Sequence, residues 1–412
     1  MPLTLALIGK RLRLARENAR ITQENAAERI GVPRTAIVQI EAGNRSTSTL
    51  ELSELANLYD RPITDFLAED NPIGAEDDIL VALYRMAPGV EADERMKNQV
   101  TRCIHICREG TDLEILLNRQ ARTGPPAYKE LAPRNVGEAI EQGNRIAEQE
   151  RKRLDLGYSP IPDMAGLICS QGIWASGTSL PNGVSGLFLN HPSLGMSILV
   201  NIDEPRNRKR FSYAHEYAHA LLDRSESIKV TKTDNRNELA EVRANAFAAA
   251  FLLPENGVTA FIASVGKGNP TRDMVPVYDL ALEKSNAPLI QVPRRAPSGS
   301  QIITCQDAAE VANHFGVSYQ AATYRLKSLR FINQAECKDL LEQENIGKLY
   351  LGAWKKESED NTCDRCLDQE IAYLALEALR LGEISQGRFN DIVDLLDIPD
   401  IESFRQFAES IH

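Results

Sequence analysis

The sequence predicts a mainly α-helical protein with one small β-sheet, an α+β chain built from several domains. Its 412 residues exceed a single core, because one domain usually contains about 150 residues. Apolar residues recur at helical spacing along most of the chain, whereas short strand-like segments occur together at 172–175, 184–189 and 196–201. Hydrophobic residues make up 43% and charged residues 25% of the chain, which is typical of a globular protein.

Clusters of proline, glycine and acidic residues divide the chain into four segments. The first is expected to be an all-α domain of five helices. The second is expected to be a helical linker or dimerisation region, with breaker-rich stretches at 68–78 and 123–135. The third contains the strands, and the fourth is a helical tail that follows a basic, proline-containing loop at 291–301. The predicted boundaries are 1–70, 71–135, 136–290 and 291–412.

The charge and the cysteine content exclude several classes of protein. A formal net charge of −11 opposes bulk attraction to nucleic acid or to an acidic membrane, so any DNA contact requires a local basic patch. The most apolar run, 244–254, is far shorter than the roughly 20 residues of a membrane-spanning helix. Seven cysteines without a framework spacing indicate reduced thiols. We therefore expect a cytoplasmic protein that makes no membrane contact.

The first segment contains the pattern of a helix-turn-helix at 21–46. Thr22 is a natural N-cap for one helix, Gly31 can adopt the left-handed conformation that ends it, and Pro33 suits the start of the next. The second helix buries apolar residues and leaves Arg34, Thr35 and Gln39 on its outer N-terminal part. This part of a recognition helix faces the major groove of DNA.

The charge of this segment agrees with DNA binding. Residues 8–45 hold eight Lys or Arg and four Glu, a net charge of +4 on an acidic chain. About residues 8–67 resemble the XRE (Cro/lambda-repressor-like) helix-turn-helix family. The resemblance implies a double-stranded DNA operator as partner, a homodimer, and contacts to bases or phosphates from Gln23, Arg34, Thr35 and Gln39. The alternative is a small helical bundle used only for protein contacts.

The third segment carries the string His215-Glu216-Tyr217-Ala218-His219. On a helix, positions i and i+4 face the same way, so both imidazoles can bind one metal ion. Glu216 lies close enough to hold and deprotonate a water molecule on that ion. Tyr217 points elsewhere and is expected in the core.

A catalytic tetrahedral site needs a third protein ligand and one open position. A second helical stretch, 237–254, offers Glu241, 22 residues after His219. Glu238 lies one turn earlier on the same face and competes for this role. Asn245 lies one turn later and can hydrogen-bond a ligand from outside the metal site.

The runs LPNGVSGLFLN, SILVNIDEPRNRKRFSYAHEYAHALLD and ELAEVRANAFAAAFLLP resemble the ImmA/IrrE family of metallopeptidases over about residues 136–265. The resemblance implies a zincin-like domain and a gluzincin-like site. Its ligands would be His215, His219 and Glu241, with Glu216 as general base. Glu241 is preferred to Glu238 because it matches the family's E-x-x-A-N pattern. The expected ion is Zn²⁺, with Mn²⁺ as the alternative, and the family's substrates include XRE-type repressors.

The alternative for this site is a closed zinc site that only supports folding, but such a site would need no Glu216. For an active site, Tyr213 and Tyr217 are weak candidates to stabilise the oxyanion.

The tail contains a second helix-turn-helix-like pattern at 307–332, in which Arg325, Lys327 and Arg330 are possible contacts to DNA or to a substrate. A structural or substrate-docking role is the preferred interpretation. The lone C-x-x-C pair of Cys363 and Cys366 lacks the further ligands of a zinc knuckle. We therefore assign no functional site to the tail. Residues expected to be incidental or packed are Cys103, His105, Cys107 and His314.

Together these patterns predict a DNA-binding transcriptional regulator fused to a metallo-endopeptidase. Its expected substrate is a repressor-type protein, either a partner or the chain's own linker near 68–135. The alternative is a transcription factor whose peptidase-like fold is a non-cutting sensor or scaffold.

Overall fold

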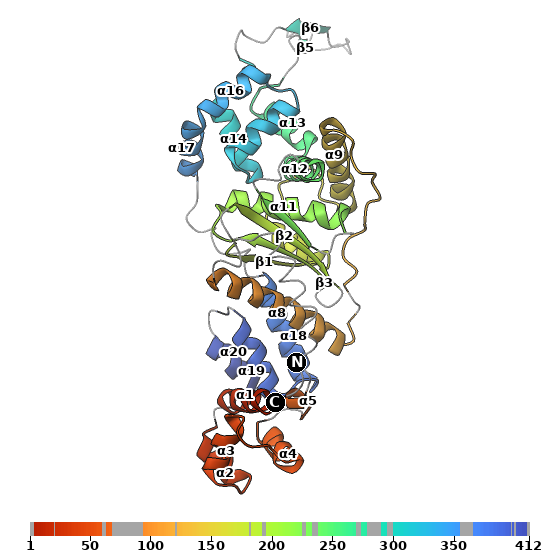
Figure 1. The fold of residues 1–412 in the computed structure, drawn as a ribbon. Coiled ribbons are helices and arrows are strands. Elements are labelled where there is room, and N and C mark those ends of the chain that lie inside the picture. The colour runs from red at the N-terminus through yellow and green to blue at the C-terminus, as the bar shows by residue number, and fades with distance from the viewer. Residues whose placement is uncertain are drawn as a thin grey trace, which may run out of the picture.

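The computed structural model describes most of the chain, namely residues 4–19, 21–59, 63–67, 94–119, 122–180, 183–191, 195–224, 228–232, 238–268, 273–277, 290–294, 300–354, 366–396, 398 and 401–409. Its layers follow one another along a long axis, with the N-terminal domain at one end (Figure 1). The predicted class, mainly α with a small β-sheet, is confirmed.

The N-terminal domain consists of the five predicted helices. Thr22 accepts a hydrogen bond from the Asn25 amide and so caps the second helix, and Gly31 takes the left-handed conformation with φ +69°. Apolar side chains including Leu12, Ile37 and Leu55 form a separate core. The helices are α1 (Leu5–Asn18), α2 (Gln23–Arg29), α3 (Arg34–Glu41), α4 (Thr49–Leu58) and α5 (Ile63–Leu67).

A four-stranded mixed sheet lies at the centre of the molecule, in the order β1-β3-β2-β4. β1 and β3 are parallel, whereas β2 is antiparallel to both of its neighbours. Three strands coincide with predicted segments, and β4 was not predicted. The strands are β1 (Trp174–Thr178), β2 (Val184–His191), β3 (Gly195–Asn201) and β4 (Ile228–Lys232).

Helices of the central domain cover one face of this sheet. α11 lies across β2 and β3, and α12 packs between α11 and α9. α9 and α12 approach closely because Gly143 has no side chain: a Cβ there would lie 2.4 Å from the Arg243 carbonyl oxygen. This packing brings two helices from different parts of the chain to one site. The helices are α9 (Val136–Arg153), α10 (Met164–Ser170), α11 (Arg206–Leu222), α12 (Leu239–Leu252) and α13 (Glu255–Ser264).

The other face of the sheet is covered by α8 (Glu94–Leu116) and α18 (Cys366–Arg380), and α19 (Gln386–Leu395) and α20 (Ile401–Glu409) pack below these two helices. Ile106, Trp174 and Phe389 belong to their common core. The predicted linker therefore contains a helix of the folded body; its residues 71–93 lie outside the described part. Ion pairs that join α8 and the stretch after it to the C-terminal helices are Arg102–Asp368, Arg119–Glu377, Arg122–Glu370 and Arg388–Glu109.

The first half of the predicted tail packs on the central domain instead. α14 and α15 form a helix-turn-helix around Gly316, which has φ +64°. Arg325, expected at a surface, is buried and donates to the Leu253 carbonyl and to Asn144. This arginine thus fastens α15 to the central domain. The helices are α14 (Cys305–Phe315), α15 (Tyr319–Ser328), α16 (Gln334–Glu342) and α17 (Glu344–Trp354).

A short hairpin pairs β5 (Asp273–Val277) with β6 (Ile290–Arg294). The stretch 291–301, predicted to be a loop throughout, therefore begins with strand residues. Its residues Ile290 and Val292 flank the polar Gln291, a short alternation that is compatible with a paired strand.

The connection from α8 to α9, residues 122–135, contains no helix or strand but is fixed to the central domain. The Tyr128 amide donates to the Leu221 carbonyl over 2.9 Å, and the Arg224 side chain donates to the Pro125 carbonyl. The Tyr128 hydroxyl also donates to buried Glu150. This connecting segment, predicted to be a loose linker, is bound along the last turn of α11.

Several minor predictions have clear outcomes. Cys103 and Cys107 are buried free thiols, and burial raises their pKa values to about 11 and about 12. His105 between them is exposed, and His314 stacks on Phe261. Cys363 lies outside the described residues, so the expectation that the C-x-x-C pair forms no zinc knuckle stays a prediction.

No single described helix is long and apolar enough to cross a membrane. α12 and α13 pass such a test together by length and composition, but they meet at a 45° bend.

Candidate functional site

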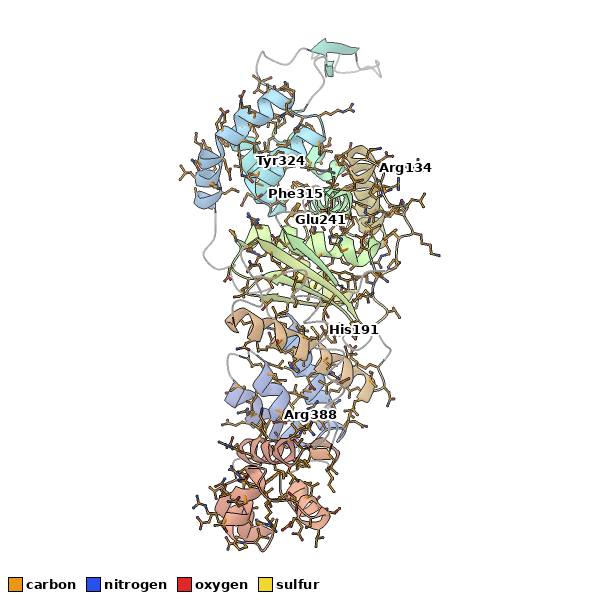
Figure 2. The ribbon with its side chains drawn as sticks, viewed as in Figure 1. Arg134, His191, Glu241, Phe315, Tyr324 and Arg388 are labelled. Atoms are coloured by element: carbon orange, nitrogen blue, oxygen red, sulfur yellow. The ribbon has the colours of Figure 1, made fainter. Side chains whose placement is uncertain are left out.

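The candidate metal centre lies between α11 and α12 above the sheet, and Figure 2 shows Glu241 in this interior position. α11 presents His215 and His219 one turn apart, as the spacing predicts. Their exposed fractions are 3% and 0%, and that of Glu241 is 1%. Two buried imidazoles and a buried carboxylate thus converge from two helices.

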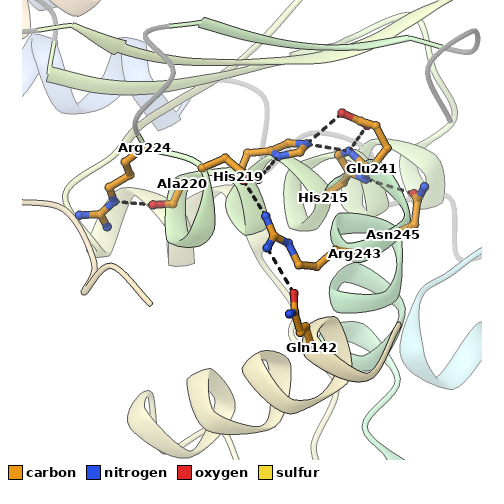
Figure 3. A network of polar contacts seen from close by, with 9 residues as sticks. Gln142, His215, His219, Ala220, Arg224, Glu241, Arg243 and Asn245 are labelled. Carbon is orange, nitrogen blue, oxygen red and sulfur yellow. Dashed lines mark hydrogen bonds and ion pairs between the residues drawn. The ribbon is translucent and has the colours of Figure 1, made fainter. Parts of the chain in front are cut away.

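The donor atoms of the three residues, with both carboxylate oxygens of Glu241 included, have separations close to those that a tetrahedral ion requires. His215 Nε2 lies 3.1 Å from Glu241 Oε2 and 3.2 Å from His219 Nε2, and His219 Nε2 lies 3.5 Å from Glu241 Oε1 (Figure 3). For zinc with ligand distances of about 2.0–2.1 Å, a tetrahedral edge is about 3.3 Å. The donor set therefore fits a two-histidine, one-glutamate metal site. Glu238, the competing candidate, is exposed at the N-cap of α12.

Hydrogen bonds at the other ring nitrogens orient both histidines. His215 Nδ1 lies 3.1 Å from Asn245 Oδ1, the contact that the sequence suggested for this residue. His219 Nδ1 lies 2.8 Å from Asp223 Oδ2. An oxygen acceptor at Nδ1 keeps the proton there and leaves the Nε2 lone pair for a metal. Asp223 was missed in the sequence, although it lies four residues after His219 and thus on the same helical face.

The charges around the site favour a bound cation. Burial alone lowers the pKa of His219, but hydrogen bonds to Asp223 and Glu241 outweigh it and raise this pKa to about 9. Burial opposes the charge of Glu241, but hydrogen bonds from the two histidines hold its pKa well below the ordinary value. The negative charge of Glu216 also raises the pKa of His219. Three carboxylates around two imidazoles thus stabilise positive charge at this point.

Glu216 lies against the sheet, where a glycine makes room for it. A Cβ built on Gly186 of β2 would lie 2.5 Å from Glu216 Oε1 and 2.8 Å from its Cγ. No larger residue fits at Gly186 unless the glutamate moves. The strand and the helix together fix the position of the predicted general base.

The two tyrosines considered for the oxyanion lie in the core. The Tyr217 hydroxyl donates to Glu150, which also accepts from Arg153, so it serves the packing of α9 on α11. Tyr213 is 2% exposed and belongs to the same core. The expected burial of Tyr217 is confirmed.

In the N-terminal domain, α3 exposes Arg34, Thr35 and Gln39 as predicted for a recognition helix. Gln23 differs, because its amide donates over 2.8 Å to Glu41 and the residue is half-buried. Glu41 in turn pairs with Arg16 through both carboxylate oxygens, at 2.6 and 3.1 Å. The amide nitrogen of Gln23 is thus engaged by Glu41, and all four residues stay predicted DNA contacts.

Replacing Arg34 by Ala is expected to weaken binding to selected DNA sites by about 1–3 kcal/mol and to relax the preference at one base position, if the guanidinium contacts a guanine. Fluorescence anisotropy on a duplex selected from a random pool measures both effects. Lys338→Ala on α16, an exposed lysine far from α3 in Figure 1, is the matched control. Equal affinity and equal preference in Arg34→Ala would remove this residue from the contact set.

Comparisons with known proteins agree with this division of the chain. Residues 170–265 match the family model Peptidase_M78, described as the IrrE N-terminal-like domain, and residues 12–66 match the family model HTH_3, described as a helix-turn-helix. Both resemblances seen in the sequence are thereby confirmed. The chain combines a helix-turn-helix DNA-binding domain with a metallopeptidase-like domain. This combination supports a regulator that contains a protease-like domain.

A solved structure, that of Bacillus thuringiensis PlcR in complex with the peptide PapR7 and DNA, is 12% identical to the chain. The match covers 98% of this chain and 99% of that chain, with a TM-score of 0.16. No curated protein matches the sequence.

Proposed function

We propose that the protein is a cytoplasmic, DNA-binding transcriptional regulator whose central domain is a zinc-dependent endopeptidase. The observation that carries this proposal is the convergence of His215, His219 and Glu241, with Glu216 next to the first ligand. A purely structural metal site has no use for a carboxylate fixed in that place. Mn²⁺ is the alternative ion for the same donors. A homodimer on a two-fold operator is part of the proposal.

The mechanism assigns each step to a residue of the chain. When bound, zinc supplies a Lewis acid that polarises the scissile carbonyl and makes water more acidic. Glu216 accepts the proton of the attacking water and returns it to the leaving amine. Asn245 hydrogen-bonds to His215 Nδ1 and so fixes the orientation of this imidazole ring. The burial of these groups strengthens their electrostatic effect on the reacting atoms.

We propose a repressor-type partner as the substrate in preference to the chain's own linker near 68–135, on the evidence of its connecting segment 122–135. A peptidase substrate must present an extended, accessible backbone, whereas this segment is tied to α11 through Tyr128 and Pro125. Cleavage of a DNA-bound repressor between its DNA-binding and dimerising parts would weaken its binding to the operator, because two linked DNA-binding domains bind two half-sites much more tightly than one domain binds one.

A cleavage assay tests the proposal. The purified full chain, stripped of metal, is incubated alone and with XRE-type repressors encoded near its gene, with Zn²⁺, Mn²⁺ or a chelator. We expect fragments that mass spectrometry detects only in the samples with metal. A complete lack of metal-dependent fragments would contradict a peptidase function.

The burial of the centre favours a second candidate function, a non-cutting sensor or scaffold. None of the three ligands is more than 3% exposed, and Glu216 is fully buried, so a protein substrate reaches them only after a rearrangement. This alternative predicts that Glu216→Gln leaves repression and induction of the target genes unchanged.

A further inference from the structure

Four successive hydrogen bonds connect a ligand of the metal centre with the connecting segment 122–135. They run from His219 through Asp223, Arg243 and Gln142 to the carbonyl oxygen of Leu131. We propose that Asp223 and Arg243 are positioning residues that hold His219 ready for the metal, and that Gln142 ties them to the connecting segment. This inference rests on the proposed metal site.

Asp223 is placed for this role by the end of α11. It is the C-cap residue, and its backbone N–H donates to the His219 carbonyl over 2.8 Å. The same residue therefore closes the last helical turn and returns its carboxylate to the ring of His219. One carboxylate oxygen lies 2.8 Å from Nδ1, and the other accepts from Arg243 over 2.6 Å.

Arg243 fixes the position of that carboxylate through an ion pair. It is 4% exposed on α12, two residues after the ligand Glu241, so one helix supplies a ligand and also restrains the partner of another ligand (Figure 3). A buried arginine is costly unless its charge is paired. Asp223 provides the pairing charge, and the same carboxylate hydrogen-bonds to His219.

The connecting segment fixes the orientation of the Gln142 side chain. Its amide nitrogen donates over 3.1 Å to the Leu131 carbonyl, which leaves Oε1 to face Arg243 Nη1 at 3.3 Å. The Leu131 side chain is 77% exposed, so the backbone alone makes this contact. The segment between α8 and α9 therefore influences the metal ligand through oriented polar groups and not through packing of Leu131.

The test measures zinc binding apart from catalysis, with Zn²⁺ alone and a competing chromophoric chelator on the full chain. Asp223→Asn preserves shape but has one acceptor oxygen, so it cannot accept from His219 and Arg243 through two oxygens. We expect the zinc affinity to fall about 10–100-fold and the visible spectrum of the Co²⁺ form to change. Asp339→Asn on α16, an exposed aspartate, is the matched control and should leave both unchanged.

A second variant separates positioning from a general loss of stability. Gln142→Met removes both hydrogen bonds at similar volume, and we expect a smaller fall in zinc affinity in the same direction, with an unchanged far-ultraviolet circular dichroism spectrum. If Asp223→Asn does not fold, the zinc affinity of Gln142→Met alone tests the inference. Wild-type zinc affinity in every folded variant would overturn the inference.

The outcomes also distinguish this inference from the proposed function. Weaker zinc binding in the variants, with no proteolysis by the wild type, would support the positioning role and reject the peptidase. Glu216-dependent proteolysis with unaltered zinc binding in Asp223→Asn and Gln142→Met would do the reverse.

Discussion

Replacing Glu216 by Gln is expected to lower the rate of metal-dependent cleavage by about 10²–10⁴-fold, the usual contribution of a positioned general base. The amide keeps the shape that fits against Gly186 but cannot accept the proton of water. Because Glu216 is not among the three grouped donors, the bound zinc should remain near one equivalent. Cleavage kinetics together with metal analysis of the same samples measure both quantities.

Glu238→Gln is the matched control for that experiment, since this glutamate is exposed at the start of α12. It should cleave at the wild-type rate. Undiminished cleavage by Glu216→Gln would show that another group acts as the base. Loss of zinc from the variant would show instead that Glu216 supports the metal site itself.

The second large effect concerns the stability of the N-terminal domain. Replacing Glu41 by Gln removes the buried charge partner of Arg16, since both residues are only 8% exposed, and leaves the guanidinium only the more exposed Glu17 at 3.6 Å. Breaking a buried pair on one side costs about 3–5 kcal/mol. We expect hydrogen exchange across α1–α5 to accelerate accordingly, while exchange in the central helices stays as in the wild type.

The double variant Arg16→Met with Glu41→Leu tests the electrostatic origin of this loss. Replacement of both charges by apolar side chains of similar size is often close to neutral, so most of the protection should return. Equal loss in the single and the double variant would assign the effect to packing and not to the unpaired charge.

The parts of the structure that local sequence signals determine were predicted well. The cap at Thr22 and the turn at Gly31 depend on neighbouring residues only, and the four-residue spacing places His215 and His219 on one face of α11. Glu241 required the family resemblance, because a helix offers several carboxylates and spacing alone left Glu238 open. Of these two glutamates, the structure places Glu241 with the imidazoles.

The contacts that were missed depend on which surfaces meet. The apolar stripes of α8 and α18 show that each helix is half-buried, but not that they pack on each other beneath β1. Arg325 lies near other basic residues in the sequence, which is typical of a surface. Its burial results from the position of α15 against α9. Asp223 had a usable signal in its spacing from His219, whereas its second partner, Arg243, comes from another helix.

The layer formed by α8 and the C-terminal helices has a consequence for biosynthesis. Arg119 and Glu377, which pair across it, are 258 residues apart. At about 5–20 residues per second, a ribosome needs about 10–50 seconds to make the intervening chain. For that time the nascent polypeptide carries α8 without its partner helices, while the N-terminal domain already has all the residues of its own core. The helix-turn-helix domain therefore emerges first, and prematurely terminated products would keep it while exposing the unshielded apolar face of α8 to chaperones and proteases.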